Sequence, residues 1–209
     1  MQNFEGSAIY WESRYKSGRT SGAGSYGILA RFKADIINNY IKKNNIDSVA
    51  ELGCGDGNQL ILADYKHYTG FDVSETAISI CKSKFAYDKS KTFLIYNGTL
   101  NEEDIKKYKS DLAISLDVIY HLVEDSVYET YLQTLFSLSN KHVIIYSSNF
   151  DDHPEFNASY ILHRKFTDYI KDSFDSWSLA QVVKNAYPFD KRNPNETTLA
   201  DFYIYERCK

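Results

Sequence analysis

Hydrophobic positions recur along the chain with two different spacings. Between residues 28 and 41 they recur every three or four residues, which predicts an amphipathic helix over 28–43. Ser74 is a good N-cap residue for another helix. We expect further helices at 58–64, 102–107, 127–138 and 158–171. Compact apolar runs predict strands at 48–52, 68–72, 92–96, 112–116, 143–146, 178–184 and 201–206.

The alternation of strands and helices predicts an α/β fold with a Rossmann-like, seven-stranded, mostly parallel sheet and helices on both faces. The last two strands follow each other without a helix between them, which predicts a C-terminal antiparallel hairpin. The length of 209 residues fits one domain. We divide this domain, 1–209, into an N-terminal segment at 1–27 and a Rossmann-like core at 28–209.

The N-terminal segment is rich in glycine and serine between residues 18 and 27, and it carries Trp11 and Arg14. Such a composition is unfavourable for regular secondary structure and favours a loop or lid. A flexible tail is the alternative. The aromatic residues and the arginine favour a segment that folds over a ligand.

A glycine-rich loop follows the first predicted strand, with glycine at every second position of 53–57. It matches the dinucleotide fingerprint G-x-G-x-x-G incompletely, because Asn58 stands at the third glycine position. Glu51 and Asp56 are acidic, and no Lys or Arg occurs over 49–65. Two carboxylates repel a pyrophosphate and attract a cation. These features disfavour a nicotinamide-dependent oxidoreductase on the same type of sheet.

The second predicted strand ends in an acidic residue, Asp72, about 20 residues after the glycine loop. A carboxylate at this place accepts hydrogen bonds from the ribose hydroxyls of a bound adenosine. An adenosine ligand that carries positive charge and no phosphate satisfies both features, and S-adenosylmethionine is such a molecule.

Three blocks of the sequence resemble the class I S-adenosylmethionine-dependent methyltransferases. They are the glycine motif from Glu51 to Gly57, the ribose acid Asp72, and the segment 111–122. The resemblance extends over nearly the whole chain. It implies S-adenosylmethionine as cofactor, S-adenosylhomocysteine as product, and a set of cofactor-binding residues: Trp11, Arg14, Glu51, Gly53, Gly55, Asp72, Val73, Asn97, Gly98 and Asp117. Within this set, the resemblance gives Arg14 the methionine carboxylate and Asn97 the adenine amine.

The acceptor is expected near the loops that follow the fourth and fifth strands. His121 is our candidate general base, because imidazole titrates near neutral pH. A histidine that only caps or packs the loop is the alternative. We expect no metal, although Asp117 and Asn149 stand where some family members bind Mg²⁺.

Tyr120, His153, His163 and Arg164 are our candidate acceptor-binding residues. The basic residues could hold an anionic acceptor, such as a phosphorylated or nucleotide-linked sugar. A solvated helix face is the alternative for this group of charges.

Composition excludes several other partners. The net charge of −4 provides no basic surface for nucleic acid. No apolar run approaches the ~20 residues that cross a membrane, and the N-terminus lacks the features of a signal peptide. Three cysteines without CxxC spacing predict a reducing cytoplasm. The sequence gives no indication of oligomeric state.

The segments 10–15, 21–26 and 115–122 also resemble a bacterial subgroup associated with surface-polysaccharide gene clusters. This resemblance implies O-methylation of a sugar or of a sugar-linked phosphate group. Methylation of another small molecule or of a protein, and a non-catalytic module that binds S-adenosylmethionine, are the alternatives.

Overall fold

A seven-stranded sheet forms the centre of the molecule, in the strand order β3-β2-β1-β4-β5-β7-β6. The computed structural model of the protein describes residues 4–151 and 158–208. β1 to β5 are parallel, and β7 runs antiparallel to both β5 and β6. The strands are β1 Ser48–Leu52, β2 His67–Asp72, β3 Lys91–Ile95, β4 Ser110–Leu116, β5 Ser139–Ser147, β6 Trp177–Val183 and β7 Asp201–Arg207. The predicted mostly parallel sheet with a C-terminal antiparallel hairpin is therefore confirmed.

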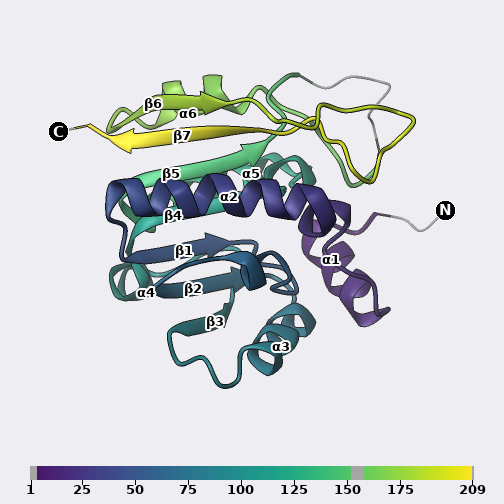
Figure 1. Cartoon of the computed structure of the whole chain (residues 1–209), viewed down its shortest axis with the longest axis horizontal. Coiled ribbons are helices and arrows are strands. Elements are labelled where there is room, and N and C mark those ends of the chain that lie inside the picture. Colours follow the sequence, from purple (N-terminus) through teal and green to yellow (C-terminus); the bar gives the residue numbers. More distant parts are fainter. Residues whose placement is uncertain (1–3, 152–157, 209) are drawn as a thin grey trace.

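Helices cover both faces of this sheet (Figure 1). α2 packs Ile37 and Ile41 into one hydrophobic cluster, whereas α5 packs Leu132 into a second one, together with Phe166 of α6. Parallel strands between two helical layers are apolar on both faces, which explains their compact apolar runs. The α-helices are α1 Ser7–Lys16, α2 Gly27–Asn44, α3 Glu75–Lys84, α4 Glu102–Tyr108, α5 Asp125–Ser137 and α6 Phe166–Ser173. Single 3₁₀ turns are η1 Ala23–Ser25, η2 Gln59–Leu62 and η3 Ile119–His121.

Three predicted elements differ from the structure. The expected loop at the N-terminus begins with the ten-residue helix α1, and the helix expected at 58–64 is the single 3₁₀ turn η2. α6 begins at Phe166 and not near residue 158. Its expected first turns run instead along the loop after β4, where the Leu162 amide donates to the Tyr120 carbonyl at 2.9 Å. This tertiary hydrogen bond replaces a helical one.

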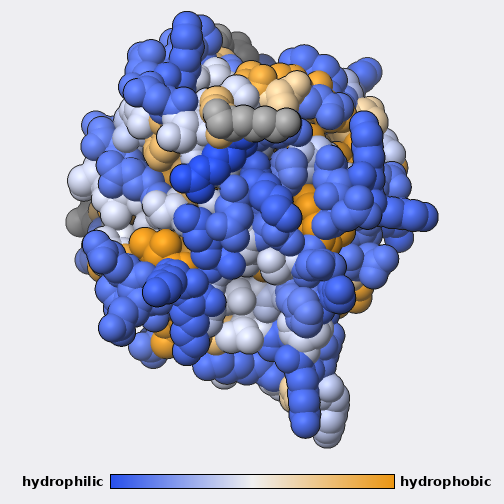
Figure 2. All heavy atoms as spheres, turned by 90° about the vertical axis from the view of Figure 1, so that its left-hand side faces the viewer, coloured by the Kyte–Doolittle hydropathy of each residue, from blue (hydrophilic) through white to orange (hydrophobic). Residues whose placement is uncertain are grey.

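The carboxyl ends of the parallel strands meet at one edge of the sheet, and α1 lies at that edge (Figure 1). The opposite edge is covered mainly by hydrophilic side chains, with only small separate hydrophobic areas (Figure 2). Within the described residues, no helix has the length and apolar character that a bilayer span requires. The edge near α1 is where a ligand of such a sheet binds.

Candidate active site

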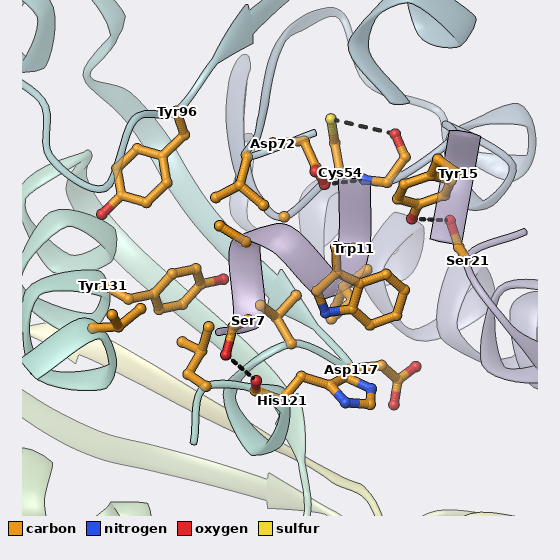
Figure 3. A pocket seen from close by; sticks show the side chains of 18 of the residues that line it. Ser7, Trp11, Tyr15, Ser21, Cys54, Asp72, Tyr96, Asp117, His121 and Tyr131 are labelled. Carbon is orange, nitrogen blue, oxygen red and sulfur yellow. Dashed lines mark hydrogen bonds between the residues drawn. The ribbon is translucent and has the colours of Figure 1, made fainter. Parts of the chain in front are cut away.

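A cavity of about 490 Å³ lies at the carboxyl edge of the sheet. Its wall is formed by the glycine loop after β1, the residues that follow β2, β3 and β4, and the N-terminal segment (Figure 3). Cavities of this size bind small molecules of cofactor dimensions.

The glycine loop requires glycine at positions 53 and 55. Gly53 has φ +83° and Gly55 has φ +56°, a backbone region that residues with a Cβ rarely adopt. A Cβ on Gly53 would lie 2.5 Å from a methyl carbon of Val118, and one on Gly55 would lie 2.8 Å from the Tyr15 hydroxyl. The loop is held against β2 because the amides of Gly53 and Cys54 both donate to the Phe71 carbonyl. A ligand can therefore approach the loop backbone closely.

Asp72 stands at the end of β2 with its carboxylate facing the cavity (Figure 3). One carboxylate oxygen accepts the Gly55 amide at 2.8 Å, and the other accepts the Ser74 amide at 2.9 Å. Each oxygen keeps a second lone pair. Burial raises the pKa of Asp72 to about 6, although the two amides oppose this shift. At neutral pH the carboxylate is ionised and can accept two further hydrogen bonds.

Glu51 is the second-last residue of β1 and also lines the cavity. Its carboxylate accepts a hydrogen bond of 2.6 Å from the Tyr68 hydroxyl. Burial raises the pKa of Glu51 to about 7, against the opposing effects of Tyr68 and of the Lys33 charge. A positively charged ligand group in the cavity would further favour the ionised form of Glu51.

Three further predicted cofactor residues line the same cavity: Val73, Asn97 and Gly98. Val73 follows β2, and the other two follow β3. The Tyr96 hydroxyl donates to the Gly98 carbonyl at 2.6 Å and fixes this turn. The ends of β2 and β3 thereby form one continuous wall.

Asp117 follows β4 and is one of two described non-glycine residues with positive φ, at +59°. Such a conformation is strained for a residue with a Cβ and is common at functional sites. One carboxylate oxygen accepts the Tyr120 hydroxyl at 3.1 Å. The other lies 2.6 Å from the ammonium nitrogen of Lys33, a side chain on α2 that is only 1% exposed. Asp117 and Lys33 both line the cavity.

α1 is attached to the core near its start and near its middle. Near its start, the Ser7 amide donates to the Glu124 carboxylate at 2.8 Å, and the Ser7 hydroxyl donates to the His121 carbonyl at 2.7 Å. One turn later, the Glu12 carboxylate accepts hydrogen bonds from Ser74 and Thr76 at the start of α3. Although burial opposes the shift, these hydrogen bonds lower the pKa of Glu12 to about 2.

The segment after α1 is attached to the glycine loop. The Asp56 carboxylate accepts the Ser21 amide at 3.0 Å and the Tyr26 hydroxyl at 3.2 Å. The Asn58 side-chain amide donates to the Ser25 carbonyl at 2.7 Å. Through α1 and this segment, the N-terminal residues Trp11, Tyr15, Ser21 and Ser25 become part of the cavity wall.

His121 lines the cavity beside Trp11, with ring centroids 4.9 Å apart in an edge-on arrangement. Its Nδ1 atom lies 3.0 Å from the Tyr160 carbonyl oxygen. Since a carbonyl only accepts, Nδ1 carries the proton and Nε2 keeps a free lone pair. Burial lowers the pKa of His121 to about 4. The imidazole is therefore neutral at physiological pH.

Two predicted residues lie beside the cavity and not in its wall. The Arg14 side chain donates to the Thr20 carbonyl at 2.7 Å, with its guanidinium 5.5 Å from the Trp11 ring centroid. The Tyr120 hydroxyl reaches Asp117 but is absent from the cavity lining. Both residues therefore support wall residues instead of forming the wall.

The predicted basic acceptor group is not gathered at the cavity. The Arg164 guanidinium donates to the Leu122 carbonyl at 2.7 Å and pairs with Asp125 at 2.7 Å. A nitrogen of His163 lies 2.7 Å from the Ser148 hydroxyl, and neither basic residue lines the cavity. His153 lies outside the described residues.

Sequence reasoning missed Lys33, although a signal was present. Leu29, Lys33, Ile37 and Ile41 follow one another at intervals of four, so the lysine stands on the apolar stripe of α2. A cation at such a position must have a buried partner. The missed wall residue Gln59 gives a weaker signal, since it follows the glycine loop by only two positions.

Comparisons with known proteins agree with this geometry. Residues 49–141 match the profile of a family described as "Methyltransferase domain", and no curated protein matches the chain. Magnesium protoporphyrin IX methyltransferase from Synechocystis PCC 6803, with bound S-adenosylmethionine, has a TM-score of 0.67 at 17% identity, over 96% of this chain and 97% of that one. N-methyltransferase NodS from Bradyrhizobium japonicum WM9, with S-adenosyl-L-homocysteine, has a TM-score of 0.67 at 13% identity, over 87% and 88%. The methyltransferase domain of bacterial CtHen1 has a TM-score of 0.66 at 16% identity, over 86% and 98%.

At such low identities the solved structures establish the fold. The domain match, which includes the glycine loop, Asp72 and Asp117, adds the chemistry. This match indicates an enzyme that transfers a methyl group.

Proposed function

We propose that this protein transfers the methyl group of S-adenosylmethionine to a small polar acceptor. One observation carries the proposal: the glycine loop and Asp72, from neighbouring parallel strands, face one cavity. Glu51 and Asp117 add two more carboxylates to the same wall. This arrangement supports a cationic adenosine ligand and disfavours a diphosphate.

The residues of the wall fit the parts of this cofactor. Asp72 has one free lone pair on each oxygen, which suits two ribose hydroxyls. Val73, Asn97 and Gly98 would surround the adenine. When bound, S-adenosylmethionine supplies an electrophilic methyl group on a positively charged sulfur, and the carboxylates favour that charge.

Methyl transfer is an in-line displacement, so the protein must align two reactants and exclude water. We propose that residues 1–27 act as a lid for this purpose. The attachment of α1 through Ser7 and Glu12, and of the following segment through Asp56, supports this interpretation.

We propose that His121 receives the acceptor proton. Its Nε2 lone pair is available, and the side chain lines the cavity. With a pKa of about 4, the imidazole is a weak base. It therefore suits a hydroxyl whose proton becomes acidic only as the new bond to carbon forms.

The proposed acceptor class is a sugar or a sugar-linked phosphate in surface-polysaccharide biosynthesis. Its support is the resemblance of segments 10–15, 21–26 and 115–122 to the bacterial subgroup. Arg164 and His163 do not add to that support, because neither side chain lines the cavity and each hydrogen-bonds another part of the protein. A cytoplasmic location is part of the proposal and rests on the three unpaired cysteines.

Calorimetric titration tests the cofactor assignment. We expect micromolar binding of S-adenosylmethionine and S-adenosylhomocysteine, and no binding of NAD. Binding of NAD alone would contradict the proposal. Incubation with S-adenosylmethionine and a panel of sugars, nucleotide sugars and phosphorylated sugars, followed by mass spectrometry for a gain of one methyl group, then tests the acceptor class.

A further inference from the structure

The Lys33–Asp117 pair places a positive and a negative charge side by side in the cavity wall. Lys33 is 1% exposed and projects from the apolar stripe of α2. Burying an ammonium is unfavourable unless it is paired, and a hydrophobic side chain at this place would stabilise the helix packing more simply. A lysine here therefore calls for a function.

The pair is held in a fixed arrangement. The Lys33 nitrogen is 2.6 Å from one oxygen of Asp117 and 5.3 Å from the centroid of the Tyr146 ring. Tyr120 fixes the other oxygen of Asp117, and the Asp117 backbone is held at φ +59°. A Cβ on Gly24 would lie 2.7 Å from the Asp117 carboxylate, so the N-terminal segment packs directly on the pair. Such a preorganised pair of opposite charges can bind a ligand group without rearrangement.

Lys33 is also the one lysine or arginine among the described residues that line the cavity. The Arg14 guanidinium, which the sequence assigned to the methionine carboxylate, instead hydrogen-bonds the Thr20 carbonyl outside the wall. An anionic group of a ligand in this cavity therefore has Lys33 as its cationic partner.

The order of the strands places the pair relative to the other ligand groups. Along the sheet edge, β3, β2, β1 and β4 present Asn97, Asp72, the glycine loop and Asp117 in succession. A ligand with its adenine near Asn97 and its ribose at Asp72 directs its amino-acid end past the glycine loop toward Asp117 and Lys33. The pair lies two strands beyond the ribose site, because β1 separates β4 from β2. Neighbouring strands are about 4.8 Å apart.

We propose that Lys33 and Asp117 together bind the zwitterionic amino-acid end of the methyl donor, Lys33 its carboxylate and Asp117 its ammonium. This inference rests on the proposed function. An ion pair complements an α-amino acid, because each charge of the pair meets the opposite charge of the ligand. Lys33 thus takes the role that the sequence assigned to Arg14.

Two thioethers, neither of which carries a charge on its sulfur, test the proposal. S-adenosylhomocysteine carries the amino-acid end, whereas 5′-methylthioadenosine lacks it and keeps the adenine and ribose. Lys33→Met should weaken the binding of S-adenosylhomocysteine roughly ten- to hundred-fold, which corresponds to the loss of one hydrogen bond to a charged group. The same substitution should leave the Kd of 5′-methylthioadenosine within about two-fold of wild type.

Two further variants separate binding from folding. Lys33→Met leaves the Asp117 carboxylate without its cation, so Lys33→Met/Asp117→Asn provides a neutral pair of similar shape. This double variant should fold, as measured by circular dichroism and thermal melting, and should show the same selective loss. Lys42→Met changes an exposed lysine of the same helix and should bind both thioethers like wild type.

The outcomes are distinct. Equal weakening of both thioethers in the folded double variant would overturn the inference, because the pair would then only support the cavity. Unchanged binding of both, with a raised KM for the acceptor, would also overturn it and move Lys33 to the acceptor site. If wild type binds neither thioether, the proposed function itself fails, and this result is visible before any variant is made.

Discussion

Removal of the Asp72 carboxylate should weaken binding of S-adenosylhomocysteine by more than ten-fold. Each oxygen would lose a hydrogen bond to a ribose hydroxyl, and a hydrogen bond to a charged group contributes about 1.5–3 kcal/mol. Two such bonds give an upper range of about 3–6 kcal/mol, which non-additivity reduces. Asp72→Ala should therefore raise the Kd on the order of hundred-fold, measured by isothermal titration calorimetry.

A matched control separates the ribose contacts from the local fold. Asp72→Ala also frees the amides of Gly55 and Ser74. Ser74→Ala instead removes the hydroxyl that caps α3 and contacts Glu12 of α1, while keeping the carboxylate. It should lower the free energy of unfolding by about 1 kcal/mol and should raise the Kd less than Asp72→Ala does. Equal affinity of Asp72→Ala and wild type would refute the ribose assignment.

The pH dependence provides a second test of the same residue. The pKa of Asp72 is raised from 3.8 to about 6, so the folded protein binds this proton more tightly than the unfolded chain. The contribution of Asp72 to stability is present below about pH 4 and is lost as pH rises through 6. Ligand affinity should change in the opposite direction, because ribose hydroxyls donate to the ionised form. Glu51→Gln removes the neighbouring group with a pKa of about 7, and the affinity of this variant should still fall below pH 6.

Three further substitutions test separate parts of the site. Gly55→Val should abolish measurable ligand binding in calorimetry, because the position has φ +56° and a Cβ would meet Ser21 and Tyr15; retained binding would remove the loop from the site. His121→Ala should reduce kcat far more than it changes the Kd of the cofactor, measured by single-turnover kinetics, and a normal kcat would exclude the role of base. Arg164→Ala should lower the unfolding free energy on the order of 2 kcal/mol, seen as a reduced Tm, because two backbone carbonyls and Asp125 lose their partner. A raised acceptor KM without a loss of stability would instead return Arg164 to the acceptor site.

The central strands of the sheet could be predicted closely because they are buried on both faces. The run at 48–52 coincides with β1, and the predicted hairpin coincides with β6 and β7 within a residue. Helix ends were less predictable, since tertiary hydrogen bonds decide them. α6 begins eight residues later than predicted, because the Leu162 amide hydrogen-bonds the loop after β4. α1 was missed because its fixation depends on Glu12 and Ser7, whose partners lie more than 60 positions away in sequence.

The site shows the same division between local and distant determinants. Gly53, Gly55 and Asp72 could be placed from sequence because strand ends in a parallel sheet converge on one edge. The direction of a long side chain is not set locally, and Arg14 and Arg164 turned to backbone carbonyls instead of the cavity. Lys33 stands on a helix 20 residues before the glycine loop, and only the packing of α2 brings it to Asp117.

Ser74 connects the ribose site to the N-terminal cover. Its amide donates to Asp72, and its hydroxyl donates to Glu12 of α1 while accepting the Ala77 amide. A ligand that fixes the Asp72 carboxylate therefore fixes Ser74, and through it the middle of α1. Because hydrogen bonds lower the pKa of Glu12 to about 2 despite its burial, this contact is present above the unfolded pKa of 4.5 and is lost only as pH falls toward 2. Cofactor recognition and the closure of the cavity thus share one residue, and they remain coupled across the pH range in which Asp72 itself titrates.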